Sequence, residues 1–292
     1  MPAVIQTQNL TKFYGNVLGI KDISLTIEKG EFYGFIGPNG AGKSTTIRAL
    51  LGLLNPTSGQ AEILGKDIRI HGAQIREKIG YLPSEVNYYD EMDSRELLEY
   101  SARFYANADV SQIDVLAERL DLNLNKKITD LSFGNKKKCA IIQCLLHKPE
   151  LLILDEPTSG LDPLIQNRFF DILKEQNKQG VTILYSSHVL SEIQRLCTRT
   201  AVIKDGEIVT VEEMSKLLIN KMKRVGLQFE QANKDIHLPE GAKDAVWQEN
   251  KLTFRFIGEI NLLLEWLATQ SPKDITIENP DLESIFMNYY QR

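Results

Sequence analysis

The chain has 292 residues, of which 42% are hydrophobic and 25% are charged, and its formal net charge is −5 at pH 7. These values are typical of a folded globular protein, and the acidic balance argues against a general nucleic-acid-binding protein, which would usually be basic. Residues 1–10 lack the charged start and apolar core of a signal peptide, and no apolar run approaches the ~20 residues that span a membrane.

Strand-like and helical patterns follow one another along the chain. The first 30 residues and residues 60–70 contain short strand-like segments separated by turn signals, which predict a small antiparallel sheet packed against the core. From residue 31 onward, short apolar runs alternate with helical patterns, which predicts a parallel sheet covered by helices. The predicted strands are 31–37, 151–157 and 180–188, the predicted hairpin is 199–211 with Asp205-Gly206 at its turn, and the predicted helices are 43–54, 94–106, 110–120, 135–147, 163–178 and 188–197.

The pattern changes after about residue 212. It predicts a helical segment over 212–223, strands over 224–230, 251–256 and 273–278, and helices over 259–270 and 280–291. This part reads as a separate small α+β unit. We therefore expect a larger domain over residues 1–215, with a helical subdomain at about 84–147, and an accessory α+β domain over residues 216–292.

The three cysteines indicate a reducing compartment. Cys139, Cys144 and Cys197 have no metal-ligand spacing, and the first two fall in the helix predicted over 135–147. We expect buried, reduced thiols, as in a cytoplasmic protein.

Residues 37–45, with the sequence GPNGAGKST, fit the phosphate-binding pattern G-x-x-x-x-G-K-[ST] between a predicted strand and a predicted helix. The glycines let backbone N–H groups curl around phosphates, and the helix N-terminus adds its positive end. Lys43 would supply a charge to the outer phosphates, and Ser44 a hydroxyl ligand to Mg²⁺. A glycine-rich turn with a stray lysine is the alternative, and the full motif in this setting argues against it.

Asp155 and Glu156 lie at the end of the buried strand in LLILDEP. Two adjacent carboxylates cannot both be buried and unpaired without a large cost in free energy. A solvated turn is the alternative reading, but next to a phosphate-binding loop Asp155 is predicted to be the second holder of Mg²⁺. Glu156 would then lie within reach of a water that attacks the γ-phosphate, where it would act as general base.

His188 follows the strand VTILYSS. A lone histidine is usually structural or on the surface. Here, however, each of three predicted strands is followed by polar residues: the loop 37–45, the pair Asp155-Glu156, and His188. The carboxyl ends of strands in an open parallel sheet line one ligand crevice, so we expect His188 to contact phosphate. We expect Glu156, His188 and Lys43 to be the catalytic residues.

Residues 131–143, LSFGNKKKCAIIQ, combine a short loop with the composition of a helix. The exposed N–H groups of a first helical turn form an anion site, so the sequence predicts a second one here.

Taken together and in their order along the chain, the motifs resemble those of the ATP-binding cassette (ABC) ATPase family over about residues 3–215. GPNGAGKST resembles its Walker A motif, LLILDEP its Walker B motif, SGLD at 159–162 its D-loop, His188 its switch histidine and LSFGN its signature, Leu-Ser-Gly-Gly-Gln. The resemblance implies ATP and Mg²⁺ as ligands. The implied ATP-binding residues are Tyr14, which would stack on adenine, and Gly37, Pro38, Asn39, Gly40, Ala41, Gly42, Lys43, Ser44 and Thr45.

The resemblance also explains the second anion site. Two cassettes of this family pack head to tail, and the signature of one closes on ATP held by the other. The implied contacts to the partner's ATP come from Ser132, Phe133, Gly134 and Asn135, and the implied D-loop is Ser159, Gly160, Leu161 and Asp162.

Three positions depart from the family pattern. Phe133 replaces the first signature glycine and Asn135 replaces the glutamine. The glutamine-loop position, whose residue contacts Mg²⁺ in the family, is Ser84, which is too short to copy that reach. Either Ser84 through a bridging water or Glu85 directly would take the role.

Residues 216–292, which end near NPDLESIFMNYY, resemble the C-terminal extension of ABC-2-type exporter ATPases, and a stability or dimerisation appendage is the alternative. The resemblance implies the ATP-hydrolysing subunit of a bacterial ABC exporter, on the cytoplasmic face of the membrane. It would pair with a second ATPase subunit and drive a separate permease that docks near residues 93–106. Similar ATPases often serve export of antimicrobial or toxic peptides.

Two alternative functions come from other classes. A soluble ABC ATPase acting on ribosomes or DNA is disfavoured by the single cassette, the lack of a coiled-coil insertion and the acidic composition. A nucleotide-gated module with weak hydrolysis is disfavoured by the intact Asp155–Glu156 pair.

Overall fold

The computed structural model describes residues 2–88, 91–214, 222–231 and 236–278. The chain divides into two compact units, Met1–Glu212 and Glu213–Arg292. The helix predicted over 280–291 lies outside the described residues, as does most of the one predicted over 212–223, although Glu213 and Met222 belong to strands. Within the described part, no helix combines the length and apolar character needed to cross a membrane.

An antiparallel sheet forms the start of the larger unit, as the sequence predicted. Its strand order is β2-β1-β5-β6, and β3 also pairs with β1. The prediction of strand up to residue 70 was wrong beyond Asp67, because the Asp67 carboxylate accepts a hydrogen bond from the Arg69 N–H and begins a helix instead. The elements are β1 (Ala3–Tyr14), β2 (Val17–Ile23), β3 (Thr26–Glu28), β5 (Ser58–Ile63), β6 (Lys66–Asp67) and α2 (Ile68–Arg76).

A six-stranded sheet with the order β11-β10-β4-β9-β8-β7 is the centre of this unit, and its strands from β10 to β7 are parallel. The predicted hairpin is present, with Asp205 and Gly206 at φ 49° and 82° in the turn between β10 and β11. The sequence reading missed β7. The strands are β4 (Phe32–Ile36), β7 (Ile79–Leu82), β8 (Leu151–Asp155), β9 (Thr182–Ser187), β10 (Arg199–Lys204) and β11 (Glu207–Glu213).

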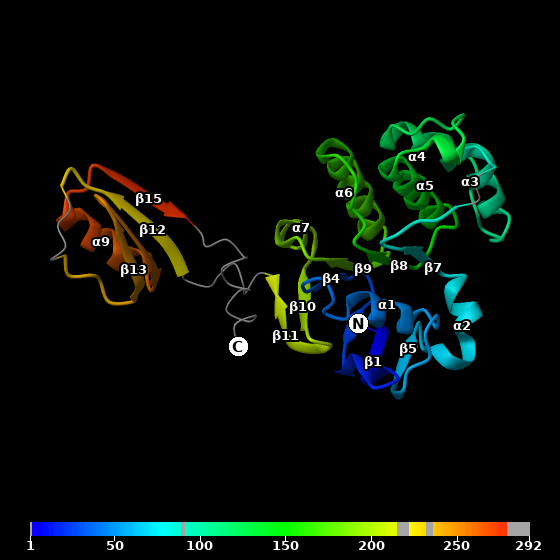
Figure 1. Ribbon diagram of the computed structural model, residues 1–292, viewed down its shortest axis with the longest axis horizontal. Coiled ribbons are helices and arrows are strands. Elements are labelled where there is room, and N and C mark those ends of the chain that lie inside the picture. The colour runs from blue at the N-terminus through cyan, green and yellow to red at the C-terminus, as the bar shows by residue number, and fades with distance from the viewer. Residues whose placement is uncertain (1, 89–90, 215–221, 232–235, 279–292) are drawn as a thin grey trace. The chain divides into compact units, whose positions relative to one another are not determined.

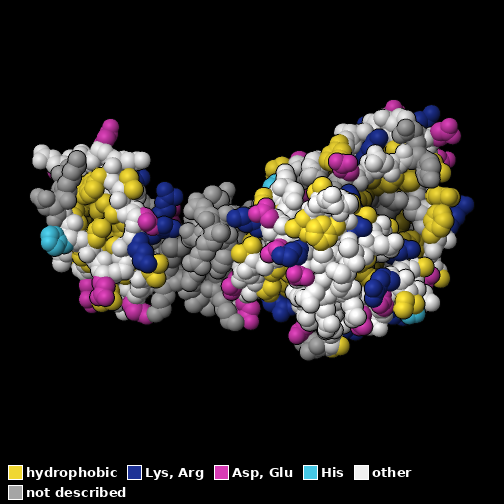
Figure 2. Space-filling view, turned by 60° about the horizontal axis from the view of Figure 1, so that its bottom comes forward, with side chains coloured by type: hydrophobic (Ala, Val, Ile, Leu, Met, Phe, Trp, Pro, Cys, Tyr) yellow, Lys and Arg dark blue, Asp and Glu magenta, His cyan; other side chains and the backbone are white. Residues whose placement is uncertain are grey.

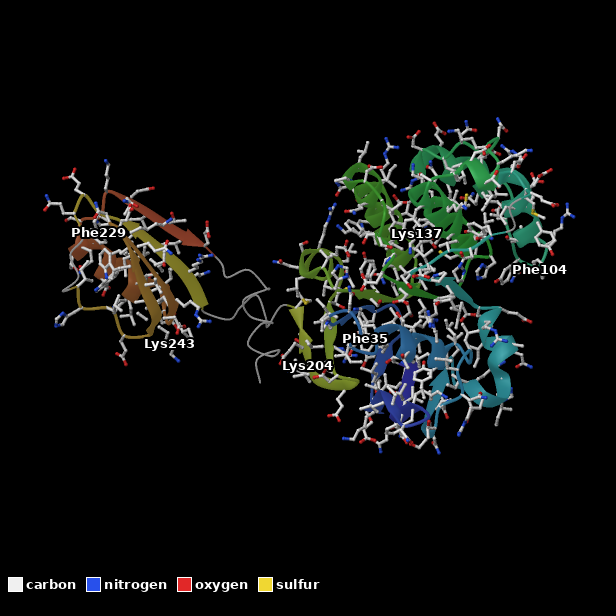
Figure 3. All side chains as sticks on the ribbon, in the orientation of Figure 1. Phe35, Phe104, Lys137, Lys204, Phe229 and Lys243 are labelled. Carbon is white, nitrogen blue, oxygen red and sulfur yellow. The ribbon has the colours of Figure 1, made fainter. Side chains whose placement is uncertain are left out.

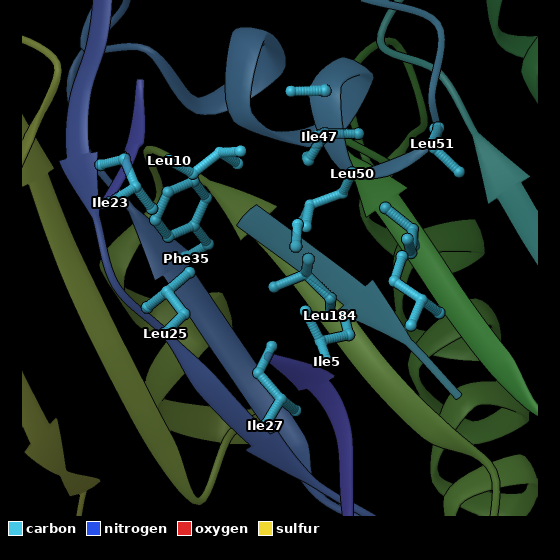
Figure 4. Packing of buried hydrophobic residues seen from close by; sticks show 14 of the residues in the cluster. Ile5, Leu10, Ile23, Leu25, Ile27, Phe35, Ile47, Leu50, Leu51 and Leu184 are labelled. Atoms are coloured by element: carbon cyan, nitrogen blue, oxygen red, sulfur yellow. The ribbon is translucent and has the colours of Figure 1, made fainter. Parts of the chain in front are cut away.

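Helices cover the two faces of this parallel sheet. Figure 1 shows α1 on the side of β1 and β5, and α3, α4 and α5 grouped on the opposite side. Between the two sheets lies a buried apolar cluster that includes Ile5, Leu10, Phe35 and Leu184 (Figure 4). The helices are α1 (Lys43–Leu50), α3 (Ser94–Ala102), α4 (Gln112–Leu120), α5 (Phe133–Leu145), α6 (Pro163–Lys178) and α7 (Leu190–Leu196), with a 3₁₀ turn at Ile128–Asp130.

The smaller unit is an antiparallel sheet with the order β13-β14-β12-β15 and one helix, α9. Its core contains Val225, Leu227, Phe254, Phe256 and Leu263. Figure 2 shows further hydrophobic side chains gathered on one face of this unit. The sequence reading missed β13, most of whose residues are exposed. The elements are β12 (Met222–Gln228), β13 (Ala242–Gln248), β14 (Lys251–Ile257), α9 (Ile260–Gln270) and β15 (Asp274–Glu278).

Candidate functional site

Four neighbouring strands of the parallel sheet carry polar groups where they end. In spatial order these strands are β4, β9, β8 and β7. The loop 37–45 follows β4, His188 follows β9, Asp155 ends β8 with Glu156 directly after it, and Pro83-Ser84 follows β7. Because the four strands are parallel, these groups meet at one edge of the sheet, as expected of a ligand site in such a fold.

The loop 37–45 holds a lysine ammonium at its centre. Gly42 caps α1 with a left-handed backbone (φ 104°), and a Cβ there would lie 3.0 Å from the Gly19 carbonyl oxygen, so only glycine fits. Lys43 is buried, and its Nζ donates to the carbonyl oxygens of Gly37 and Pro38 at 2.6 and 3.1 Å. The loop therefore curls around a fixed positive charge.

Glu156 links this charge to His188. Its carboxylate lies 3.1 Å from Lys43 Nζ and 2.8 Å from His188 Nδ1. The Glu156 backbone is left-handed (φ 46°), which is uncommon for a residue with a side chain. This conformation follows directly after β8, and the side chain that it carries reaches both Lys43 and His188.

Asp155 is fully buried, and its Oδ1 accepts a hydrogen bond of 2.7 Å from Ser186 Oγ on the adjacent strand β9. Its Oδ2 has no hydrogen-bond partner among the described residues. A buried carboxylate oxygen without a partner is costly unless a ligand supplies one. Carboxylate and hydroxyl oxygens such as those of Asp155 and Ser44 are ligands of the kind that Mg²⁺ takes.

A cleft of about 450 Å³ opens at this edge of the sheet. Tyr14, whose ring is 45% exposed, stands at one side of it, with Val17 and Leu18 beside it. Of the two glutamine-loop candidates, Ser84 lines the cleft, whereas Glu85 is exposed and does not. The predicted residues that line it are Tyr14, Pro38, Asn39, Gly40, Gly42, Lys43, Ser44, Thr45, Ser84 and Glu156.

The other predicted residues lie outside this cleft wall. Gly37, Ala41 and Asp155 are buried, and His188 is connected to the cleft through Glu156. Ser159 Oγ donates to the Glu156 carbonyl oxygen at 3.0 Å, which ties the segment 159–162 to the same edge.

A second cavity, also of about 450 Å³, lies at the N-terminus of α5. Ser132 caps this helix by accepting a hydrogen bond from the Asn135 N–H. A Cβ on Gly134 would lie 2.4 Å from the Gly160 carbonyl oxygen, and one on Gly160 would lie 2.3 Å from the Phe133 ring, so the two loops are closely packed. The predicted residues that line it are Ser132, Gly134, Asn135, Gly160, Leu161 and Asp162.

Sequence reasoning missed three polar side chains that support the site. Ser186 binds Asp155, and Lys137 on α5 donates to the carbonyl oxygens of Pro83 and Ser84. Glu192, which is buried, accepts hydrogen bonds from the hydroxyls of Thr158, Tyr185 and Ser187. A lysine in a run of three is usually solvated, so only the packing of α5 on β7 reveals Lys137.

Comparison with known proteins decides the family. Residues 20–159 match the model of the ABC transporter family. The chain is 37% identical over 246 residues to the bacitracin transport ATP-binding protein BcrA of Bacillus licheniformis, a match that covers 82% of this chain and 79% of that protein. The chain belongs to the ABC transporter ATP-binding family. The resemblance found from the motifs is thus confirmed, and so is the predicted fold class.

Further relatives support the same assignment for this ABC ATPase. It is 37% identical over 217 residues to the linearmycin resistance ATP-binding protein LnrL of Bacillus subtilis, covering 71% of this chain and 68% of that one. A solved ATP-binding subunit of an ABC transporter superposes with a TM-score of 0.69 at 28% identity, over 73% and 91% of the two chains. A dimeric cassette, MJ0796, in a post-hydrolysis state with ADP and Pi superposes with 0.67 at 27% identity, over 72% and 98%.

Proposed function

We propose that this ABC ATPase binds two ATP molecules between two head-to-tail copies and uses their hydrolysis to drive a separate transmembrane permease of a bacterial exporter. It would act on the cytoplasmic face of the membrane. The relatives named for bacitracin transport and linearmycin resistance suggest an antimicrobial compound as cargo. The single observation that carries the head-to-tail arrangement is the separation of the two anion sites within one chain.

The two cavities share no lining residue in the described parts of the chain. The signature loop opens beside Gly160–Asp162, whereas the nucleotide cleft opens between the loop 37–45, Tyr14 and Ser84. This separation supports an arrangement in which a second chain brings its signature onto the bound nucleotide. The positive end of α5 and its free N–H groups would then face the partner's γ-phosphate.

The cleft provides groups for binding and for proton transfer. Tyr14 would stack on the adenine ring, and Lys43 would turn from its loop carbonyls to the phosphates. That movement would release Glu156 from its 3.1 Å contact with Lys43 and leave its carboxylate free to take a proton from the attacking water. His188, 2.8 Å from Glu156, would orient this carboxylate and contact the γ-phosphate.

Ser44 and Asp155 would hold Mg²⁺ together with phosphate oxygens. Among the described residues, no group of three His, Cys, Asp or Glu side chains could bind a metal alone. The bound ion would neutralise charge on the phosphates. Ser84, rather than Glu85, would complete this shell through a bridging water, and its position in the cleft wall supports this choice.

The permease would dock in an apolar groove of about 370 Å³ on the larger unit. This groove lies where α3 and α5 meet β7 and the end of α1, and the exposed ring of Phe104 stands on its rim. Figure 3 shows Phe104 at the outer side of α3. Its position overlaps the segment 93–106, where the family resemblance places the permease contact.

Mixed dimers test the head-to-tail arrangement. Asn135→Asp keeps the shape of the side chain and adds a negative charge at the first turn of α5, which favours the helix and repels the partner's γ-phosphate. This substitution is cleaner than a change at Gly134, where any Cβ would collide with Gly160. We expect Asn135→Asp and Lys43→Ala homodimers each to lose ATP-driven association.

A mixed dimer of one Asn135→Asp chain and one Lys43→Ala chain would hold one site with both lesions and one intact site. We expect ATP-driven association and turnover to recover above either homodimer, as measured by light scattering and phosphate release. Mixed dimers shown to form by dual-tag purification but without any recovery would contradict the proposal.

A further inference from the structure

The signature helix carries a buried lysine that the roles proposed above do not use. Lys137 is 0% exposed and lies in the second turn of α5. Its Nζ donates to the carbonyl oxygens of Pro83 and Ser84 at 2.7 and 3.0 Å. Figure 3 shows Lys137 in the interior of the larger unit, between α5 and the parallel sheet.

The segment that receives these hydrogen bonds belongs to the nucleotide cleft. Pro83 and Ser84 follow β7, whose last residue, Leu82, pairs with Leu154 beside Asp155. Ser84 itself lines the cleft together with Lys43 and Glu156. The position of Ser84 therefore depends on a side chain of the signature helix.

The same helix supports this segment a second time. Tyr88 OH donates to Gln143 Oε1 at 2.7 Å, and Gln143 lies farther along α5. The segment 83–88 is thus fastened to α5 at both ends. A hydrogen-bonded helix moves as a unit, so a shift of its signature end would be carried to Ser84.

Burying the charged ammonium of Lys137 costs desolvation free energy. Burial lowers the pKa of Lys137 to about 8, and the charges of Asp155 and Glu156 oppose that shift. An apolar side chain would pack there without this cost. What the lysine adds is two charge-assisted hydrogen bonds to one short stretch of backbone.

We propose that Lys137 is a positioning residue of the ATPase cycle, which holds the Ser84 loop to the signature helix so that hydrolysis in a chain's own cleft depends on the position of its own signature. This inference rests on the proposed head-to-tail function. Its first test, however, needs only homogeneous protein and makes no use of that arrangement.

The first test compares Lys137→Met and Lys137→Arg in the full chain. Methionine matches the volume and removes the donors, whereas arginine keeps the donors and adds bulk. We expect Lys137→Met to lower kcat at least tenfold with ATP affinity and KM within threefold, and Lys137→Arg to retain more turnover than Lys137→Met. Lys136→Met, which removes a half-buried charge from the same turn, is the matched control and should keep kcat within twofold.

A higher turnover in Lys137→Met than in Lys137→Arg would overturn the proposal, because it would mean that this position needs a side chain of matching volume and not a hydrogen-bond donor. A parallel loss of ATP affinity and kcat in Lys137→Met would do the same. If the methionine variant does not fold, Lys137→Gln replaces it, because its neutral amide removes the charge that strengthens the two hydrogen bonds to Pro83 and Ser84. A kcat equal to that of the unsubstituted protein would then overturn the proposal.

The second test locates the effect in a mixed dimer. One chain carries Lys43→Ala, so the single working site joins the other chain's cleft to the first chain's signature. We expect Lys137→Met to lower turnover at least fivefold more in the chain that supplies the cleft than in the chain that supplies the signature. Equal losses of turnover in the two arrangements would contradict the inference. If the mixed dimer with Lys43→Ala alone has no turnover, that result counts against the proposed function, and the first test decides the role of Lys137.

Discussion

At the scale of single residues, the site is organised around one carboxylate that contacts a lysine and a histidine. Glu156 contacts Lys43 at 3.1 Å and His188 at 2.8 Å, and it follows a strand that ends in a second acid, Asp155. The two acids differ in their surroundings. Asp155 is fully buried against a serine hydroxyl, whereas Glu156 faces the cleft. This difference suits one acid to a metal and the other to a proton.

Replacing Glu156 by glutamine tests the assignment of the base. The amide keeps the shape but cannot accept the proton, so we expect MgATP binding to persist and turnover to fall by about 10²- to 10⁴-fold. ATP should then trap this variant as a dimer, which light scattering would detect. Glu150→Gln, at the other end of β8 in an exposed pair with Lys78, is the matched control. Turnover near the unsubstituted level in Glu156→Gln would show that another group is the base.

At the scale of elements, α5 and β7 form a junction held by a buried histidine. His147, just past the end of α5, has Nε2 at 3.0 Å from the Ile79 carbonyl oxygen and stacks on Tyr105 with ring centroids 4.0 Å apart. Burial lowers the pKa of His147, although its backbone hydrogen bonds oppose the shift. The junction is thus best formed when His147 is neutral.

This pKa shift predicts how the larger unit responds to acid. The unfolded chain takes up a proton on this histidine at pH near 6.5, whereas the folded chain takes it up only at lower pH. The free energy of unfolding should therefore decline as the pH falls below about 6.5, and decline less in His147→Phe, which keeps the stacking.

Urea unfolding followed by far-UV circular dichroism would measure this decline. Both tryptophans, Trp247 and Trp266, belong to the smaller unit, so their fluorescence is an internal reference. His71→Gln, on α2, is the matched substitution. An equal pH dependence with and without His147 would contradict the expectation.

The carboxylate of Glu192 also connects elements: it joins α7 to β9 and to the segment before the D-loop. It accepts hydrogen bonds from three hydroxyls, two of which, on Thr158 and Ser187, lie beside the D-loop and beside His188. Glu192→Gln should lower the free energy of unfolding by about 1–3 kcal/mol and reduce turnover, because an amide cannot accept all three hydrogen bonds. Glu207→Gln, on the surface, is the control, and equal stability of the two variants would contradict this role.

The sequence predicted an element where its own residues fix the local conformation, and it missed elements that depend on distant partners. The Walker A glycines, the acid pair and the turn at Asp205-Gly206 each impose a conformation by themselves, so the elements around them were predicted. β7 has only four residues and owes its strand form to its pairing with β8, and β13 has no buried alternation to reveal it. Lys137 was missed because burial of a charge depends on carbonyls 54 and 53 residues away.

At the scale of the whole larger unit, one helix lines the apolar groove and supports a loop of the nucleotide cleft. α5 supports Ser84 in the cleft through Lys137, and its Gln143 and Cys144 line the groove. Burial raises the pKa of Cys144 to about 12, so this thiol serves as packing. The prediction of buried, free cysteines is confirmed for all three. A partner seated in the groove would therefore press on the same helix that holds the Ser84 loop.

Coupling through this helix makes the groove testable by its effect on ATP hydrolysis. Phe104 is 68% exposed on the groove rim, and its ring packs edge-on against Tyr100 with centroids 5.1 Å apart. A solvent-exposed aromatic pair beside an apolar groove is typical of a binding surface. We expect Phe104→Glu to abolish co-purification with the permease and its stimulation of turnover, while the isolated chain still binds MgATP.

Val115→Glu is the matched control for this change, because Val115 is a 48% exposed apolar residue of α4, in the same helical region but outside the groove. Co-expression with the permease and measurement of ATPase rates in nanodiscs would compare the two variants. A negative charge in an apolar contact costs several kcal/mol if it is buried without a partner, which is enough to break a subunit interface. If Phe104→Glu and Val115→Glu bind the permease equally well, the docking surface lies elsewhere on the chain, and α5 does not connect the permease to the Ser84 loop.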